Sequence, residues 1–61
     1  MTQRELGKKV RDARELRGYT QRELAKIIGV SAGTVAAWEQ GIHAPDLTKL
    51  INVFRELGRY I

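Results

Sequence analysis

The sequence predicts an all-α fold, a compact bundle of four short helices in a single domain that spans residues 1–61. Apolar residues recur three and four positions apart in four segments, which is the period of a helix with one buried face. Each segment follows a Ser, Thr or Asp and ends near a glycine, the residue types preferred at helix ends. No stretch alternates apolar and polar residues over a useful length, so no strand is predicted.

The first two helices are predicted at residues 3–17 and 21–28. Both begin within the same tetrapeptide, Thr-Gln-Arg-Glu, in which the Thr is the capping residue. In this capping box, the hydroxyl and the Glu three positions later each accept a backbone N–H of the other residue. The predicted inner face of the first helix comprises Leu6, Val10, Ala13 and Leu16. That of the second comprises Leu24, Ala25 and Ile28, with Ile27 on the outer side.

Two more helices are predicted after these. Ser31 is expected to cap a helix over residues 32–40, with Val35 and Trp38 on its inner side. Asp46 is expected to cap a last helix that ends at Gly58. Its predicted apolar stripe comprises Leu47, Leu50, Ile51, Phe54 and Leu57.

The last residues of the chain leave two alternatives open. Residues 58–61 are too few for an element of their own, but Tyr60 and Ile61 are apolar. Either Phe54 and Leu57 belong to the core and this tail covers them, or the four side chains form a patch that contacts a second copy of the chain. The first alternative is the ordinary fate of apolar residues on a helix of a small domain.

The charge of the chain is unevenly distributed. The net charge is +4, from 11 Lys and Arg against 7 Asp and Glu. Residues 1–29 contain eight basic and four acidic residues, whereas residues 30–61 contain three of each. All of the excess therefore lies in the first half. This pattern suits an anionic polymer such as nucleic acid, although a solvated helix face would look the same.

Composition argues against several other classes of function. The chain has no cysteine and one histidine, His43, so no disulfide, thiolate metal site or nucleophile–base pair can be assembled. We therefore expect no enzyme, no metal, no cofactor and no small-molecule substrate. No apolar run approaches the roughly 20 residues of a membrane span, and the default expectation is a soluble, cytoplasmic protein.

Residues 21–40 have the layout of a helix-turn-helix, in which two short helices are joined by only three residues. Gly29 can turn the chain without a side-chain penalty, and Val30 can fill the angle between the helices. Ala25 is small, so the two helices can approach each other closely. The second of them is then held with one face outward.

The spacing of these residues resembles the lambda-repressor-like, Cro-type helix-turn-helix family, also called the XRE family. The resemblance covers residues 6–58. It is carried by Val10, Arg14, Gly18, Tyr19, Thr20, Gln21, Leu24, Ala25, Ile28, Gly29, Val30, Ser31, Val35, Trp38, Glu39, Gly41 and Pro45. It implies four or five short helices, with the helix at 32–40 in the major groove of DNA and the helix at 21–28 across the backbone.

The resemblance also implies roles for individual residues. Gln21 is expected to contact a phosphate or a base, and Arg14 and Glu39 match an ion pair that ties the first helix to the third. Two unrelated surface charges are the alternative for that pair. Trp38 is expected to pack in the core rather than to stack on a base. With the nearby polar and basic residues added, the DNA-binding candidates are Thr20, Gln21, Arg22, Ser31, Ala32, Gly33, Thr34, Ala37, Lys26, Arg14 and His43.

The sequence departs from the family pattern in three ways. Where relatives carry long polar side chains, the DNA-facing positions here include Ala32, Gly33 and Ala37, which cannot make the bidentate contacts worth about 1–3 kcal/mol per base. The following loop offers only His43. Contacts to DNA phosphates are therefore expected from the basic residues of the first half of the chain, of which Arg14, Arg22 and Lys26 are the best candidates. The usual fifth helix is missing or reduced to residues 58–61, which leaves the dimer contact open.

The leading hypothesis is a sequence-specific transcriptional regulator, a repressor of the phage or antitoxin type. It would bind double-stranded DNA as a homodimer on a pseudo-palindromic site whose half-sites lie about 34–36 Å apart. Two alternatives follow from the lack of long polar side chains on the DNA-facing side of the helix at 32–40. One is a protein-interaction module with this fold, and the other is a weakly specific module that tethers something else to DNA.

Overall fold

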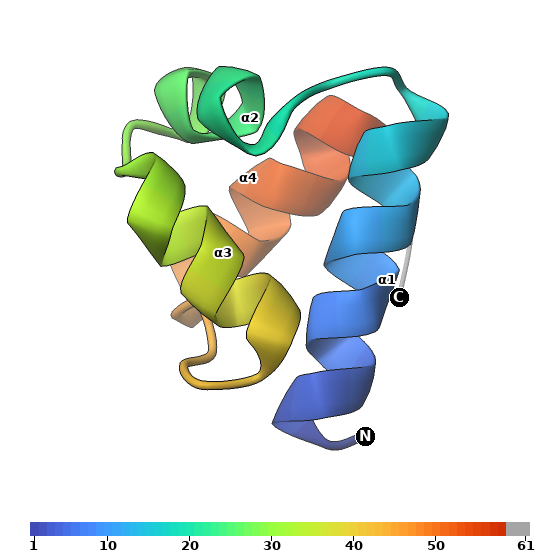
Figure 1. Ribbon diagram of the computed structural model, residues 1–61, viewed down its shortest axis with the longest axis vertical. Helices are drawn as coiled ribbons and strands as arrows, with labels where there is room; N and C mark the ends of the chain where they lie inside the picture. The colour runs from blue at the N-terminus through green and yellow to red at the C-terminus, as the bar shows by residue number, and fades with distance from the viewer. Residues whose placement is uncertain (59–61) are drawn as a thin grey trace.

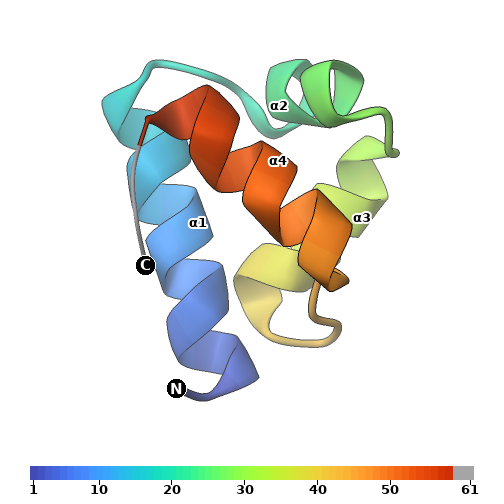
Figure 2. The ribbon, with the colours of Figure 1, turned by 180° about the vertical axis from the view of Figure 1, so that it is seen from behind.

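The computed structural model describes residues 1–58, which form four α-helices and no strand. The helices are α1 (Gln3–Leu16), α2 (Gln21–Ile28), α3 (Ala32–Gln40) and α4 (Leu47–Leu57). Helices α1 and α3 stand on two sides of the bundle, α4 crosses behind them, and α2 closes one end (Figures 1 and 2). The all-α prediction is confirmed, and the predicted bounds differ from the observed ones only at the end of α1.

The two copies of the Thr-Gln-Arg-Glu tetrapeptide form the same capping structure. The Thr2 hydroxyl accepts the N–H of Glu5 at 3.1 Å, and the Glu5 carboxylate accepts the N–H of Thr2 at 2.9 Å. Thr20 and Glu23 repeat this exchange at 3.0 and 2.8 Å. The hydrogen bond from the backbone of Thr2 lowers the pKa of Glu5. Each box satisfies two backbone N–H groups that a helix start would otherwise leave unpaired.

The remaining helix starts use a single capping side chain. Ser31 accepts the N–H of Thr34 at 3.1 Å, and Asp46 accepts the N–H of Lys49 at 2.9 Å. The bond from the backbone of Lys49 lowers the pKa of the Asp46 carboxyl. All four predicted caps are therefore observed.

The turn between α2 and α3 depends on a left-handed residue. Gly29 has a φ of 87°, which most side chains would make unfavourable. The N–H groups of Gly29 and Val30 both donate to the carbonyl of Ala25, at 2.8 and 2.9 Å. Val30 is half-buried and packs against the core, as predicted for a residue that fills the angle between the two helices.

The core lies where the four helices meet, and every helix contributes to it. Its largest fully buried side chains come from all four elements, and α3 packs mainly against α1 and α2. Burial of this apolar surface is the main favourable contribution to folding. The buried apolar residues are Val10, Ala13, Leu24, Ala25, Val35, Trp38, Val53, Phe54 and Leu57.

One predicted core residue of α1 is not in the core. The side chain of Leu16 is 68% exposed, so its assignment to the inner face was wrong. At about 100° per residue, position 16 lies well past the face that Val10 defines, whereas position 17 returns to it. Arg17 is exposed but lies over that face, and its Nε donates to the carbonyl of Leu57 at the end of α4, at 2.7 Å.

The inner face of α4 also differs from the predicted stripe. Leu47 and Ile51 are 71% and 48% exposed, while Val53 is fully buried. Val53 stands three residues after Leu50 and four before Leu57, which places it on the buried face. Phe54 and Leu57 are buried as well, so they belong to the core; the expectations for Tyr60, Ile61 and a fifth helix lie outside the described residues. Within residues 1–58, no helix is both long and apolar enough to cross a bilayer.

Helix α1 approaches the end of α3 closely because of a glycine. Gly7 is buried, and a Cβ at this position would overlap the carbonyl oxygen of Trp38 in α3. The atom in the way belongs to the backbone, so it cannot move aside as a flexible side chain would. The absence of a side chain at Gly7 therefore sets the distance between these two helices.

Gly7→Ala is expected to lower the free energy of unfolding by about 1–3 kcal/mol, because the added methyl group overpacks a backbone contact. Gly33→Ala is the matched control. The nearest atom to a Cβ at Gly33 is the Ser31 hydroxyl at 3.8 Å, so this change should stabilise the helix by up to about 1 kcal/mol. Urea unfolding of both variants measures the two effects. Equal stability of the two variants would contradict the proposed close contact.

Candidate nucleic-acid interface

A buried carboxylate joins three helices beside the start of α2. The side chain of Glu39, on α3, is only 3% exposed. It accepts the Nε of Arg14 from α1 at 2.7 Å and the Nη2 of the same guanidinium at 3.1 Å. It also accepts the side-chain amide of Gln21, the first residue of α2, at 2.9 Å. The ion pair implied by the family resemblance is thus present, with Gln21 as an additional member.

All three guanidinium nitrogens of Arg14 donate hydrogen bonds within the protein. Its third nitrogen donates to the carbonyl of Tyr19 at 2.7 Å, and the residue is only 8% exposed. Hydrogen bonding to Glu39 raises the pKa of Arg14, so the guanidinium keeps its charge. The structure therefore places Arg14 in the ion pair rather than on the surface available to a phosphate.

Gln21 is positioned by its bond to Glu39. Its amide nitrogen donates one hydrogen to that bond, and its amide oxygen and backbone N–H have no hydrogen-bond partner among the described residues. The first N–H groups of a helix have no partner within the helix and favour anions. Gln21 is half-buried, so it lies at the border between the core and the candidate interface.

Ser31 and Thr34 meet at the start of α3. Their hydroxyl oxygens are 2.9 Å apart, and the Ser31 oxygen also accepts the N–H of Thr34. One hydroxyl hydrogen is used between them, whichever residue donates it. The other remains, so the pair can offer one donor to a phosphate or a base edge.

The outward face of α3 carries mostly small side chains. Gly33 is exposed, and Ala36 and Ala37 are half-buried. Ala32 is half-buried and packs against the core. Methyl groups of this kind can contact a thymine methyl but cannot form hydrogen bonds with bases.

Gln40 is a further candidate on this face, beyond those predicted from the sequence. It is exposed at the end of α3, three residues after Ala37 and seven after Gly33, which places it on the same face. Glutamine can make a bidentate contact with adenine in the major groove. The spacing could have revealed this residue, but the family resemblance drew attention only to earlier positions of the helix.

The other candidates lie around this face. Arg22 and Lys26 are exposed one turn apart on α2, and His43 is exposed in the loop after α3. Thr20 is exposed, and its oxygen and backbone N–H serve the capping box. Its hydroxyl hydrogen has no partner among the described residues, so it can still donate to a phosphate.

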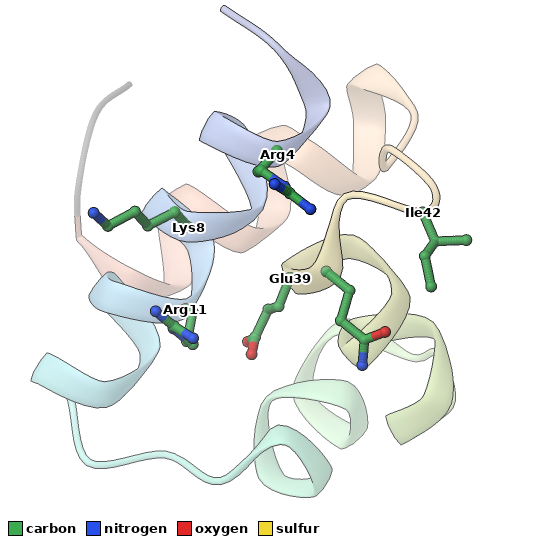
Figure 3. Close-up of a pocket in the computed structure, with 6 residues that line it drawn as sticks. Arg4, Lys8, Arg11, Glu39 and Ile42 are labelled. Atoms are coloured by element: carbon green, nitrogen blue, oxygen red, sulfur yellow. The ribbon is translucent and has the colours of Figure 1, made fainter.

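A hollow of about 510 Å³ lies beside the Glu39 carboxylate, between α1 and the end of α3. Figure 3 shows the basic side chains of α1 on one side of it and the last residues of α3 on the other. Its lining residues are Arg4, Lys8, Arg11, Glu39, Gln40 and Ile42.

This geometry defines a helix-turn-helix domain with an exposed second helix, and comparison with known proteins agrees. A family model described as helix-turn-helix matches residues 10–61. The chain is also 40% identical over 50 residues to an uncharacterized HTH-type transcriptional regulator of Methanothermobacter thermautotrophicus, a match that covers 82% of this chain and 72% of that protein. The chain belongs to the Cro-type helix-turn-helix (XRE) family of DNA-binding transcription regulators.

Glu39→Ala is expected to lower the free energy of unfolding by about 3 kcal/mol or more, because it leaves the buried guanidinium of Arg14 without its partner. Glu15→Ala is the matched control. The Glu15 carboxylate is 3.8 Å from the same guanidinium but its side chain is 61% exposed, so this loss should stay within about 1 kcal/mol.

Urea unfolding checks both values. A double-mutant cycle with Arg14→Met should show that the two losses at positions 14 and 39 are strongly non-additive. If Glu39→Ala lowers the free energy of unfolding no more than Glu15→Ala does, the Glu39 carboxylate does not hold the three helices together.

Proposed function

We propose that this domain binds double-stranded DNA in a sequence-specific manner and acts as a transcriptional repressor. In this proposal, α3 enters the major groove and α2 lies across the backbone, as is usual for the motif. The main support is the outward face of α3, which is exposed while the opposite face is fixed by Val35, Trp38 and the bonds of Glu39. A rigid exposed helix is what reading of a groove requires.

The small side chains of α3 favour a particular way of reading DNA. Gly33 and the alanines allow the helix backbone to approach the base edges closely, and alanine can contact thymine methyl groups. We propose that direct hydrogen bonds come from Gln40, from the Ser31 and Thr34 hydroxyl pair, and from the oxygen of Gln21. Sequence-dependent DNA shape would supply the rest of the specificity.

Phosphate contacts are proposed at both ends of this surface. The start of α2 can bind a phosphate through its first N–H groups and the Gln21 side chain. Arg22 and Lys26 are exposed on the same short helix, and Thr20 precedes it. His43, exposed after α3, is the candidate on the other side.

A homodimer is proposed from the dimensions of the domain. Its longest principal extent is 24 Å, whereas half-sites of a pseudo-palindromic operator lie about 34–36 Å apart. One copy therefore covers one half-site, and a second copy is needed for the other. A dimer bound in this way would act by occupying its operator, which is how we propose that the protein represses transcription, as a repressor of the phage or antitoxin type.

The second candidate function is a weakly specific module that tethers a partner to DNA or contacts a protein through α3. It is favoured by the lack of long polar side chains at Gly33, Ala36 and Ala37. The two functions differ in a measurable way, because a tether binds DNA without preferring a sequence and a pure protein-interaction module does not bind it.

Selection from random DNA, followed by affinity measurements at two salt concentrations, tests the proposal. We expect an enriched motif, and an affinity that falls with salt with a log–log slope near −0.9 for each neutralised phosphate. Binding without an enriched motif would support the tether instead. No binding at low salt would overturn DNA binding altogether.

Gln21→Ala is expected to weaken binding to the selected site by about tenfold, a loss of about 1.4 kcal/mol, because both the proposed DNA contact and the bond to Glu39 are removed. Gln3→Ala removes an exposed glutamine from the start of α1 and serves as the control. Gel-shift or anisotropy titrations at fixed salt compare the two. Equal affinity of both variants would show that the Gln21 side chain does not contact DNA.

A further inference from the structure

Three basic residues follow one edge of α1. Arg4, Lys8 and Arg11 are spaced by four and three residues, which aligns them along one side of a helix. All three are exposed, and within residues 1–58 none of them forms an ion pair. Their charges are therefore available to an external anion.

The row borders a hollow that close helix packing creates. The hollow of about 510 Å³ is lined by these three residues together with Glu39, Gln40 and Ile42 (Figure 3). A Cβ at Gly41 would lie 2.9 Å from the Cα of Arg4, so the start of α1 rests directly against the end of α3. This packing places the row beside the last residues of the other helix, with the Arg4 side chain directed toward them and that of Lys8 extending to the far side (Figure 3).

The charge of the hollow is positive despite the carboxylate in its wall. Glu39 is neutralised by Arg14, whose Nε lies 2.7 Å from its Oε2. The three cations of α1 then have no compensating charge in the lining. A cluster of this kind attracts an anion and would repel a basic partner.

The hollow is continuous with the surface proposed to face DNA. Glu39 lines the hollow and accepts the Gln21 amide from the start of α2. Gln40 lines it too and belongs to the outward face of α3. A DNA strand that passes the start of α2 would thus meet the cations of α1 next.

We propose that Arg4, Lys8 and Arg11 form an additional phosphate-binding surface, which extends the DNA contact along the backbone beyond α2 and α3. This inference rests on the proposed DNA binding. The row spans about 10 Å at 1.5 Å per residue, enough to meet two neighbouring phosphates of one strand. It compensates for the loop after α3, whose only basic candidate is His43.

The test compares two variants that remove the same charge. Lys8→Ala with Arg11→Ala removes two cations of the row and leaves Arg4, whose backbone packs on Gly41. The control combines Lys9→Ala with Arg55→Ala. Both control residues are exposed, Lys9 on the opposite edge of α1 by helix periodicity and Arg55 on α4, which crosses behind α1 and α3 (Figure 1). Affinity for the selected site is measured over a range of salt concentrations.

The Lys8 and Arg11 variant should reduce the magnitude of the log–log salt slope by about 0.9 for each phosphate that is no longer neutralised, up to about 1.8. Its affinity at low salt should fall at least tenfold. The control should change the slope by less than half as much. Selection from random DNA should return the same motif for the variant as for the unmodified chain, because phosphate contacts carry no sequence information.

The outcomes separate this inference from the proposed function. If the unmodified chain does not bind DNA, the proposed function fails. If it binds its motif but the two double variants have equal slopes and affinities, DNA binding stands and the surface on α1 does not contact phosphate. A changed motif in the Lys8 and Arg11 variant would also overturn the inference, because the row would then influence base readout.

Discussion

The bonds of the Glu39 carboxylate fix the relative positions of α1, α2 and α3. One group on α3 accepts two hydrogen bonds from the Arg14 guanidinium and one from the Gln21 amide. Such a buried arrangement contributes little net stability compared with an apolar replacement, but it tolerates few geometries. The start of α2 therefore keeps a fixed position relative to the outward face of α3. Such a fixed position is required if one helix is to contact a groove of DNA while the other contacts the backbone.

Small residues also determine how the helices joined by the Glu39 carboxylate pack. Gly7 and Gly41 let α1 lie against the end of α3, since a side chain at either position would meet backbone atoms. Small residues also occupy the outward face of α3, where Gly33 and two alanines leave the helix backbone accessible. Close approach and DNA shape can then substitute in part for long polar side chains. In the proposed complex, the cations that contact the phosphates come mainly from α1 and α2 rather than from the loop after α3.

Local signals in the sequence predicted the helices well, because capping residues and glycines act within a few positions. The Thr2 and Thr20 capping boxes and the turn at Gly29 are examples. Periodicity alone was less reliable at the helix ends, where Leu16 and Leu47 are exposed. The bond between Gln21 and Glu39 joins residues 18 positions apart, and the hollow beside Arg4 depends on how α1 meets α3. Neither can be derived before the helices are placed in space.

The most direct test of the central claim is methylation interference with dimethyl sulfate on the selected DNA site. The reagent methylates guanine N7 in the major groove and adenine N3 in the minor groove. If α3 lies in the major groove, methyl groups on N7 should block binding at the guanines of each half-site, because the close approach of Gly33 and Ala37 leaves no room for them. Interference confined to adenine N3, with none at the guanines of a half-site, would contradict this placement of α3.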